Sequence, residues 1–115
     1  MPKRDDDLLI ADMIECCHKI LDFVDDIDYE TFINDAKTVD AVIRNFEVLG
    51  EACKYISIEI KSLNPFVEWR KIADFRNILI HNYFGIDYGI MWNIIQNELP
   101  YQLEFLEQVD TNPGE

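Results

Sequence analysis

Apolar residues recur every three or four positions along most of this chain, and this period is the strongest constraint on its fold. The first run contains Ile10, Met13, Ile14, Cys17, Ile20, Leu21, Val24 and Ile27. The second run contains Val39, Val42, Ile43, Phe46, Leu49, Cys53, Ile56, Ile60 and Leu63. Such spacing places the apolar side chains on one face of an α-helix. No segment shows the strict alternation of a half-buried strand, so the sequence predicts an all-α fold.

Capping residues and helix breakers set the expected boundaries. The aspartates at 5–7 are suited to an N-cap and first turn, and the acidic stretch 25–28 ends the first helix. Residues 29–35 are expected to form a short helical turn. The second run predicts one helix of about 25 residues that stops at Asn64, because proline disfavours helical geometry in the residue before it. Gly50 within that helix indicates a close approach by another backbone.

Two more segments complete the predicted bundle. A third helix is expected over about 67–80, with Gly85 just beyond its end and Asp87 as the N-cap of the next segment. In that last segment Pro100 either kinks the helix or occupies the first turn of a final one. The prediction is an antiparallel bundle of four main helices with a short extra or kinked helix. We expect one domain, 1–115, in which residues 110–115 form a frayed C-terminal tail.

The charge is strongly acidic but unevenly distributed. Ten basic and 23 acidic residues give a net charge of −13, which ordinarily counts against a nucleic-acid partner. Seven of the ten cations lie within residues 36–81, where the net charge is +1. No apolar stretch approaches the ~20 residues of a membrane span, and three aspartates follow the first two cations. These features predict a cytoplasmic protein without a membrane partner.

Three cysteines, an odd number, suggest no disulfide framework. The cluster formed by Cys16, Cys17 and His18 lacks a second ligand pair at a usable spacing, so we expect packing and no metal. No cofactor is expected either. His18 is expected to be solvated or to cap a helix.

One short segment concentrates reactive side chains. Arg76, Asn77, His81 and Tyr83 interrupt an otherwise apolar run. On a continuous helix, Arg76 and His81 are about 140° apart and do not converge. They would converge if the helix ends near His81, or if a second copy of the chain supplies the partner residues.

An arginine and a histidine without a metal suffice in principle for RNA cleavage by the substrate's own 2′-hydroxyl. The histidine moves a proton while the guanidinium stabilises the charged phosphorane. The spacing alone is weak support, because a surface salt bridge and a capping histidine are the commoner roles of such residues. By the same argument, Glu47 and Glu51 are expected to be a solvated helix face.

The run from Arg76 to Tyr83 resembles the Arg-(four residues)-His-X-Tyr signature of HepT-type toxins, which are HEPN-domain ribonucleases. Other stretches follow the same family in order: Arg4-Asp5, the segments 40–45 and 49–52, Trp69, Arg76-Asn77, the turn 81–85 and Trp92. Asn82 occupies a variable position of the signature.

The resemblance implies a fold, an activity and partners. HepT-type toxins form homodimers in which the two Arg-His motifs face each other across a cleft. Arg76 and His81 would be catalytic in a metal-independent endoribonuclease, with Asn77 supporting. A minimal nucleotidyltransferase (MNT) antitoxin would neutralise the toxin by AMP transfer to Tyr83, as in a type VII-like toxin-antitoxin system. The alternative is a non-catalytic helical module that binds and regulates such a nucleotidyltransferase.

Overall fold

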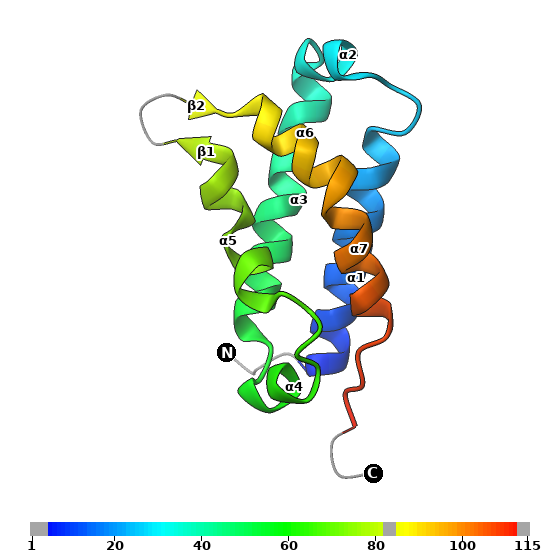
Figure 1. Ribbon diagram of the computed structural model, residues 1–115, viewed down its shortest axis with the longest axis vertical. Coiled ribbons are helices and arrows are strands. Elements are labelled where there is room, and N and C mark those ends of the chain that lie inside the picture. The colour runs from blue at the N-terminus through cyan, green and yellow to red at the C-terminus, as the bar shows by residue number, and fades with distance from the viewer. Residues whose placement is uncertain (1–4, 82–84, 113–115) are drawn as a thin grey trace.

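The computed structural model describes residues 5–81 and 85–112 and measures 48 × 30 × 22 Å along its principal axes. The described residues form helices and one minimal strand pair (Figure 1). The elements are α1 (Asp6–Phe23), α2 (Tyr29–Ile33), α3 (Ala36–Tyr55), α4 (Ile58–Leu63), α5 (Trp69–Leu79), β1 (Ile80–His81), β2 (Gly85–Ile86), α6 (Tyr88–Asn97) and α7 (Leu99–Glu107). The predicted all-α fold is confirmed, and the two-residue strands are an addition that the pattern did not predict.

Helix α3 is the central element of the bundle. It packs along α1 on one side and against α5 on another, while α7 lies on α1 (Figure 1). Their apolar faces form one core whose fully buried members include Met13, Ile20, Phe46, Leu49, Ile72, Phe75, Met91 and Leu99. The rings of Phe46 and Phe75 meet edge to face at a centroid distance of 5.7 Å. This aromatic contact fastens α5, which carries the candidate site, to α3.

The prediction of one long second helix is wrong. The chain leaves helical geometry at Ile56 (φ −63°, ψ 136°), and Ser57 caps a separate helix, α4, by accepting a hydrogen bond from the Ile60 amide. Ser57 is itself held by Asp6, whose carboxylate accepts bonds from its amide at 3.0 Å and its hydroxyl at 2.8 Å. The apolar period continues across the break, so periodicity alone cannot detect it.

Two other expectations about the helices are resolved. Helix α6 ends at Asn97, and Pro100 lies in the first turn of α7, so the proline opens a new helix. A Cβ at Gly50 would lie 3.1 Å from the carbonyl oxygen of Ala73. The predicted close approach at this glycine is therefore confirmed, and it brings the backbones of α3 and α5 together.

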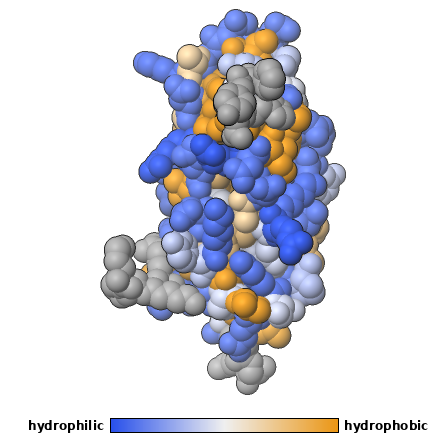
Figure 2. Space-filling model, turned by 90° about the vertical axis from the view of Figure 1, so that its left-hand side faces the viewer, coloured by the Kyte–Doolittle hydropathy of each residue, from blue (hydrophilic) through white to orange (hydrophobic). Residues whose placement is uncertain are grey.

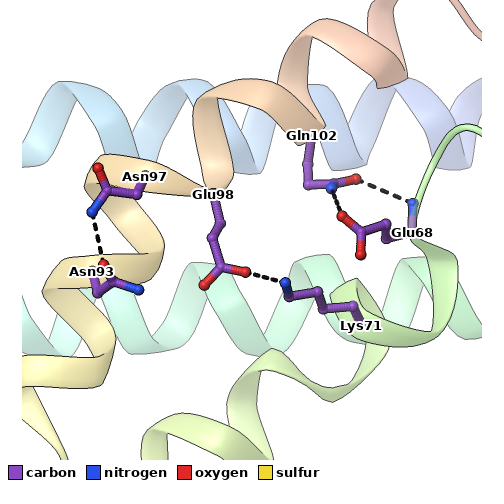
Figure 3. A network of polar contacts seen from close by, with 6 residues as sticks. All are labelled: Glu68, Lys71, Asn93, Asn97, Glu98 and Gln102. Carbon is purple, nitrogen blue, oxygen red and sulfur yellow. Dashed lines mark hydrogen bonds and ion pairs between the residues drawn. The ribbon is translucent and has the colours of Figure 1, made fainter.

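Polar contacts fix the start of α5 against α7 (Figure 3). Gln102, buried on α7, accepts a hydrogen bond from the Glu68 amide at 3.2 Å and donates one to its carboxylate at 2.8 Å. One turn further along α5, Lys71 forms an ion pair with Glu98. These contacts set the position of the helix whose other end carries Arg76.

Asn64 joins three parts of the chain from a buried position. Its side-chain amide donates to the carbonyls of Ile60 and Asp110 and accepts from the Asp110 amide at 3.0 Å. Its own carbonyl accepts from the Trp69 indole N–H at 3.0 Å. The connection before α5 and the segment after α7 are thereby tied together.

Asn64→Ala should lower the free energy of unfolding by about 1–3 kcal/mol, because the amide and carbonyl of Asp110 lose their part-buried partner. Urea denaturation would measure the change. Asn97→Ala is the matched control, since Asn97 is exposed and bonds only Asn93 among the described contacts. Equal stability of the two variants would contradict the structural role given to Asn64.

Residue 112 is the last described, and residues 113–115, the end of the predicted tail, lie outside the described residues. The single-domain boundary and the frayed tail stay predictions. Within the described residues, no helix combines the length and apolar character needed to cross a bilayer.

Candidate functional site

The candidate site lies where α5 ends. The amide of Ile80 donates to the carbonyl of Arg76, and the chain then becomes extended. Ile80 pairs with Ile86 and His81 with Gly85 in an antiparallel ladder, while the Asp87 amide donates to the Leu79 carbonyl at 2.8 Å. Gly85 has a φ of +78°, which glycine adopts without the strain that a Cβ would introduce. Asp87 then caps α6 by accepting from the Ile90 amide, as predicted.

The helix therefore ends before His81, which was one of the two routes by which the arginine and the histidine could converge. His81 lies on β1, and its backbone pairing is described. Its side-chain position is not among the described features, and Asn82, Tyr83 and Phe84 lie outside the described residues. The roles of His81 and Tyr83 thus stay predictions.

Arg76 lies on the exposed face of α5 and contacts α3. Its Nε is 3.4 Å from Oε1 of Glu47, and the two side chains are 50% and 38% exposed. Ion pairs with this exposure contribute at most about 1 kcal/mol, so the guanidinium is held loosely. Asn77 donates to the Asp74 carboxylate at 2.8 Å. Half of the Arg76 side chain stays open to a ligand.

A surface hollow of about 220 Å³ lies along the junction of α3 and α5 at this point. It is lined by Glu47, Gly50, Glu51, Lys54, Ala73, Arg76 and Asn77. Figure 2 shows this side of the molecule, which is largely hydrophilic, with apolar groups gathered in its upper part at the level of β1 and β2. The structure thus brings Arg76 and Asn77 together with Lys54, two cationic groups beside one polar hollow.

Comparisons with known proteins identify the family. Residues 13–109 match the family described as Ribonuclease HepT-like. The chain belongs to the HepT-like ribonuclease family. The match includes the HepT-like segment from Arg76 to Tyr83 and most of the bundle.

Named relatives agree with this HepT-like assignment. The chain is 42% identical over 100 residues to "Putative RNase MJ1380" of Methanocaldococcus jannaschii, covering 87% of this chain and 92% of the relative. It is 39% identical over 98 residues to "Probable ribonuclease HepT" of Thermococcus cleftensis, covering 85% and 89% respectively. No solved structure matches the chain significantly.

Glu47, which contacts Arg76, is the residue of this HepT-like site that the sequence did not reveal. It was interpreted only as part of a solvated face, and its contact with Arg76 depends on how α3 and α5 are aligned. The glycine at 50, opposite Ala73, was the one available signal that the two helices meet here. Sequence alone does not say which residue of α5 then faces which carboxylate.

The three cysteines are all buried, where packing of at least one was expected, and His18 is exposed. Among the described residues, no three His, Cys, Asp or Glu side chains gather as metal ligands do. Burial raises the pKa of Cys16 and Cys53 to about 11, and that of Cys17 to about 12. At neutral pH these residues are therefore protonated thiols within the core.

We expect iodoacetamide at pH 8 to leave all three thiols of the native protein unmodified, because the reactive thiolate is scarce and shielded. In urea, mass spectrometry should find three carbamidomethyl groups. Rapid modification of the native protein, or stoichiometric zinc or iron in the purified sample, would instead support a cysteine-based site.

Proposed function

We propose that this chain is a metal-independent endoribonuclease that cleaves RNA through the 2′-hydroxyl of its substrate. The half-exposed Arg76 guanidinium carries the proposal, because it lies at the end of α5 with the strand of His81 directly after it. Membership of the HepT-like family and the relatives named as ribonucleases support the same activity.

The chemistry assigns a role to each residue. The His81 imidazole accepts the proton of the 2′-hydroxyl, whose oxygen attacks the adjacent phosphorus. The bond from phosphorus to the 5′-oxygen breaks, and this oxygen leaves with the proton that the His81 imidazolium returns. The products are a 2′,3′-cyclic phosphate and a free 5′-hydroxyl. Arg76 stabilises the negative charge of the phosphorane. Asn77 donates a hydrogen bond to Asp74 and thereby supports the C-terminal end of α5, where Arg76 lies.

Two copies of the chain would place both motifs at one cleft. A dimer would bring two Arg76 guanidinium groups to one cleft, which favours a phosphate there in an otherwise acidic protein. The apolar groups at the level of β1 and β2 offer contact area for a second copy (Figure 2). We therefore propose a homodimer as the active form.

The test is cleavage of total RNA by the purified, unmodified protein in the presence of EDTA. Discrete fragments that end in a 2′,3′-cyclic phosphate are expected. Cleavage that requires added Mg²⁺, or fragments with another terminus, would contradict the proposed chemistry. Intact RNA, from protein whose mass shows no adduct, would contradict the ribonuclease itself.

The proposed biological role is that of a cytoplasmic toxin in a type VII-like toxin-antitoxin system. A minimal nucleotidyltransferase antitoxin would transfer AMP to the hydroxyl of Tyr83, releasing pyrophosphate from ATP. The attached phosphodiester adds negative charge and an adenosine next to the motif. Both repulsion and occlusion then oppose binding of RNA.

Tyr83→Phe removes the hydroxyl that would accept AMP. Co-expressed with the cognate nucleotidyltransferase, this variant should stay unmodified and toxic, whereas the parent protein gains AMP and loses activity. Intact-mass measurement and growth curves would follow both. Tyr101→Phe, which alters an exposed tyrosine of α7, is the control and should still be modified.

A second candidate function is a non-catalytic module that binds and regulates the nucleotidyltransferase. Two observations favour it: the net charge of −13, which suits a basic protein partner, and the engagement of Arg76 by Glu47. Under this alternative, substitution of His81 changes neither RNA cleavage nor growth.

A further inference from the structure

A second hollow, larger than that beside Arg76, lies along the exposed face of α3. Its volume is about 420 Å³. Buried or half-buried apolar groups form its floor, with Leu9 from α1 and Val48 and Ala52 from α3. This hollow has enough room for one planar heterocycle on an apolar surface.

The two hollows are neighbours that share part of their lining. Glu47 and Glu51 line both, and Glu47 is also the residue that contacts Arg76. A strand of RNA with a phosphate at Arg76 therefore has a neighbouring nucleotide within reach of the α3 face. Arg44, which also lines the larger hollow, offers a second cation for the backbone.

The two carboxylates restrict what part of an RNA strand can lie here. A phosphate facing Glu51 would be repelled, whereas N–H groups on the edge of a base would be hydrogen-bonded. Glu47 forms an ion pair with Arg76. Within residues 5–81 and 85–112, Glu51 forms no ion pair. Glu51 is thus the exposed acceptor of this groove.

The ring of Tyr55 adds a stacking surface. It is 58% exposed and lies one helical turn beyond Glu51, a separation of about 5–6 Å between Cβ atoms. A base that stacks on this ring can therefore direct its edge toward the Glu51 carboxylate. Aromatic stacking combined with hydrogen bonds to base edges is how proteins recognise single-stranded RNA.

Guanine is the base whose edge matches the Glu51 carboxylate. Its N1–H and N2–H₂ groups are adjacent donors, which match the two oxygens of a carboxylate. Adenine, cytosine and uracil each place an acceptor beside their donor, and that acceptor would face an anionic oxygen. We propose that the groove formed by Val48, Glu51, Ala52 and Tyr55 is a guanine subsite next to the phosphate at Arg76. This subsite rests on the proposed ribonuclease function and would make cleavage depend on a neighbouring guanosine.

Binding of mononucleotides tests the subsite without cleavage. Guanosine 3′-monophosphate should bind more tightly than inosine 3′-monophosphate, which lacks the N2 amino group, by about tenfold or more in calorimetric titrations. Glu51→Gln should bring this ratio close to one, because an amide replaces one acceptor with a donor. Glu104→Gln makes the same change on an exposed part of α7 and should keep the ratio of the parent.

Tyr55 separates stacking from edge recognition. Tyr55→Ala should weaken the binding of both nucleotides by a similar factor, about fivefold or more. Tyr55→Phe keeps the ring and should therefore keep the affinity. On RNA, the parent should cleave next to guanosine in preference to inosine, and Glu51→Gln should lose that preference.

The guanine subsite and the proposed ribonuclease activity can fail independently of each other. Equal affinity for the two nucleotides, or a ratio that survives Glu51→Gln, overturns the subsite even when Arg76-dependent RNA cleavage is intact. Guanosine-selective binding by a protein that leaves RNA uncut supports the subsite and overturns the ribonuclease. Absence of nucleotide binding overturns the subsite.

Discussion

His81→Ala should reduce the rate of RNA cleavage at least about a hundredfold, because the 2′-hydroxyl loses the group that accepts its proton. Arg76→Ala should cost a similar factor, since the phosphorane loses its cation. Initial rates on a short labelled RNA, with substrate in excess and EDTA present, measure both effects. Arg76→Ala retains the core, because Arg76 is exposed and lies outside the buried cluster.

The chain contains its own controls for these two substitutions. His18, its other histidine, is exposed on α1, and Arg70 is exposed near the start of α5. His18→Ala and Arg70→Ala should cleave at the rate of the parent. If all four variants lose activity equally, the effect lies in charge or folding rather than in the Arg-His motif. If none loses activity, the Arg-His motif is not the site of cleavage.

Phe46→Ala should lower the free energy of unfolding by about 3–5 kcal/mol, which is a large part of the 5–15 kcal/mol typical of a domain. The ring is fully buried and meets Phe75 edge to face. Its removal leaves a cavity in the core between α3 and α5, the two helices that the contact between Glu47 and Arg76 also joins. Urea denaturation with linear extrapolation gives the change.

Phe23→Ala provides the comparison on the surface. That ring is 40% exposed at the end of α1, so its loss should cost well under half as much. Phe46→Leu, which fills part of the cavity, should fall between the two. A cost below about 1 kcal/mol for Phe46→Ala would mean that α3 and α5 are not held by this pair.

Most of the bundle follows from the sequence, because the apolar period and the capping residues act locally. Asp87 caps α6 and Gly50 marks the α3–α5 crossing, as predicted. The break between α3 and α4 was not predictable in the same way. It depends on Asp6, which lies 51 residues before Ser57, and local propensity carries no information about such a contact.

The candidate site, like the fold, is predictable from the sequence where its features are local and not where they depend on contacts between distant residues. The residue types at 76, 77 and 81 indicate phosphate chemistry, and their spacing resembles a family signature. The contact of Arg76 with Glu47 depends on the register of two helices that are far apart in sequence. The end of α5 at Leu79 depends on pairing with residues 85–87, so a helical projection of the motif places His81 on the wrong element.

Because α5 ends between the arginine and the histidine, these two residues belong to separately adjustable parts of the molecule. Arg76 is fixed by the bundle, whereas His81 is fixed by a ladder of two residue pairs. Changes in the length or composition of the turn between the strands can therefore shift the histidine without disturbing the helix or the core. The site can be retuned by evolution, or by design, through the segment that joins the two strands.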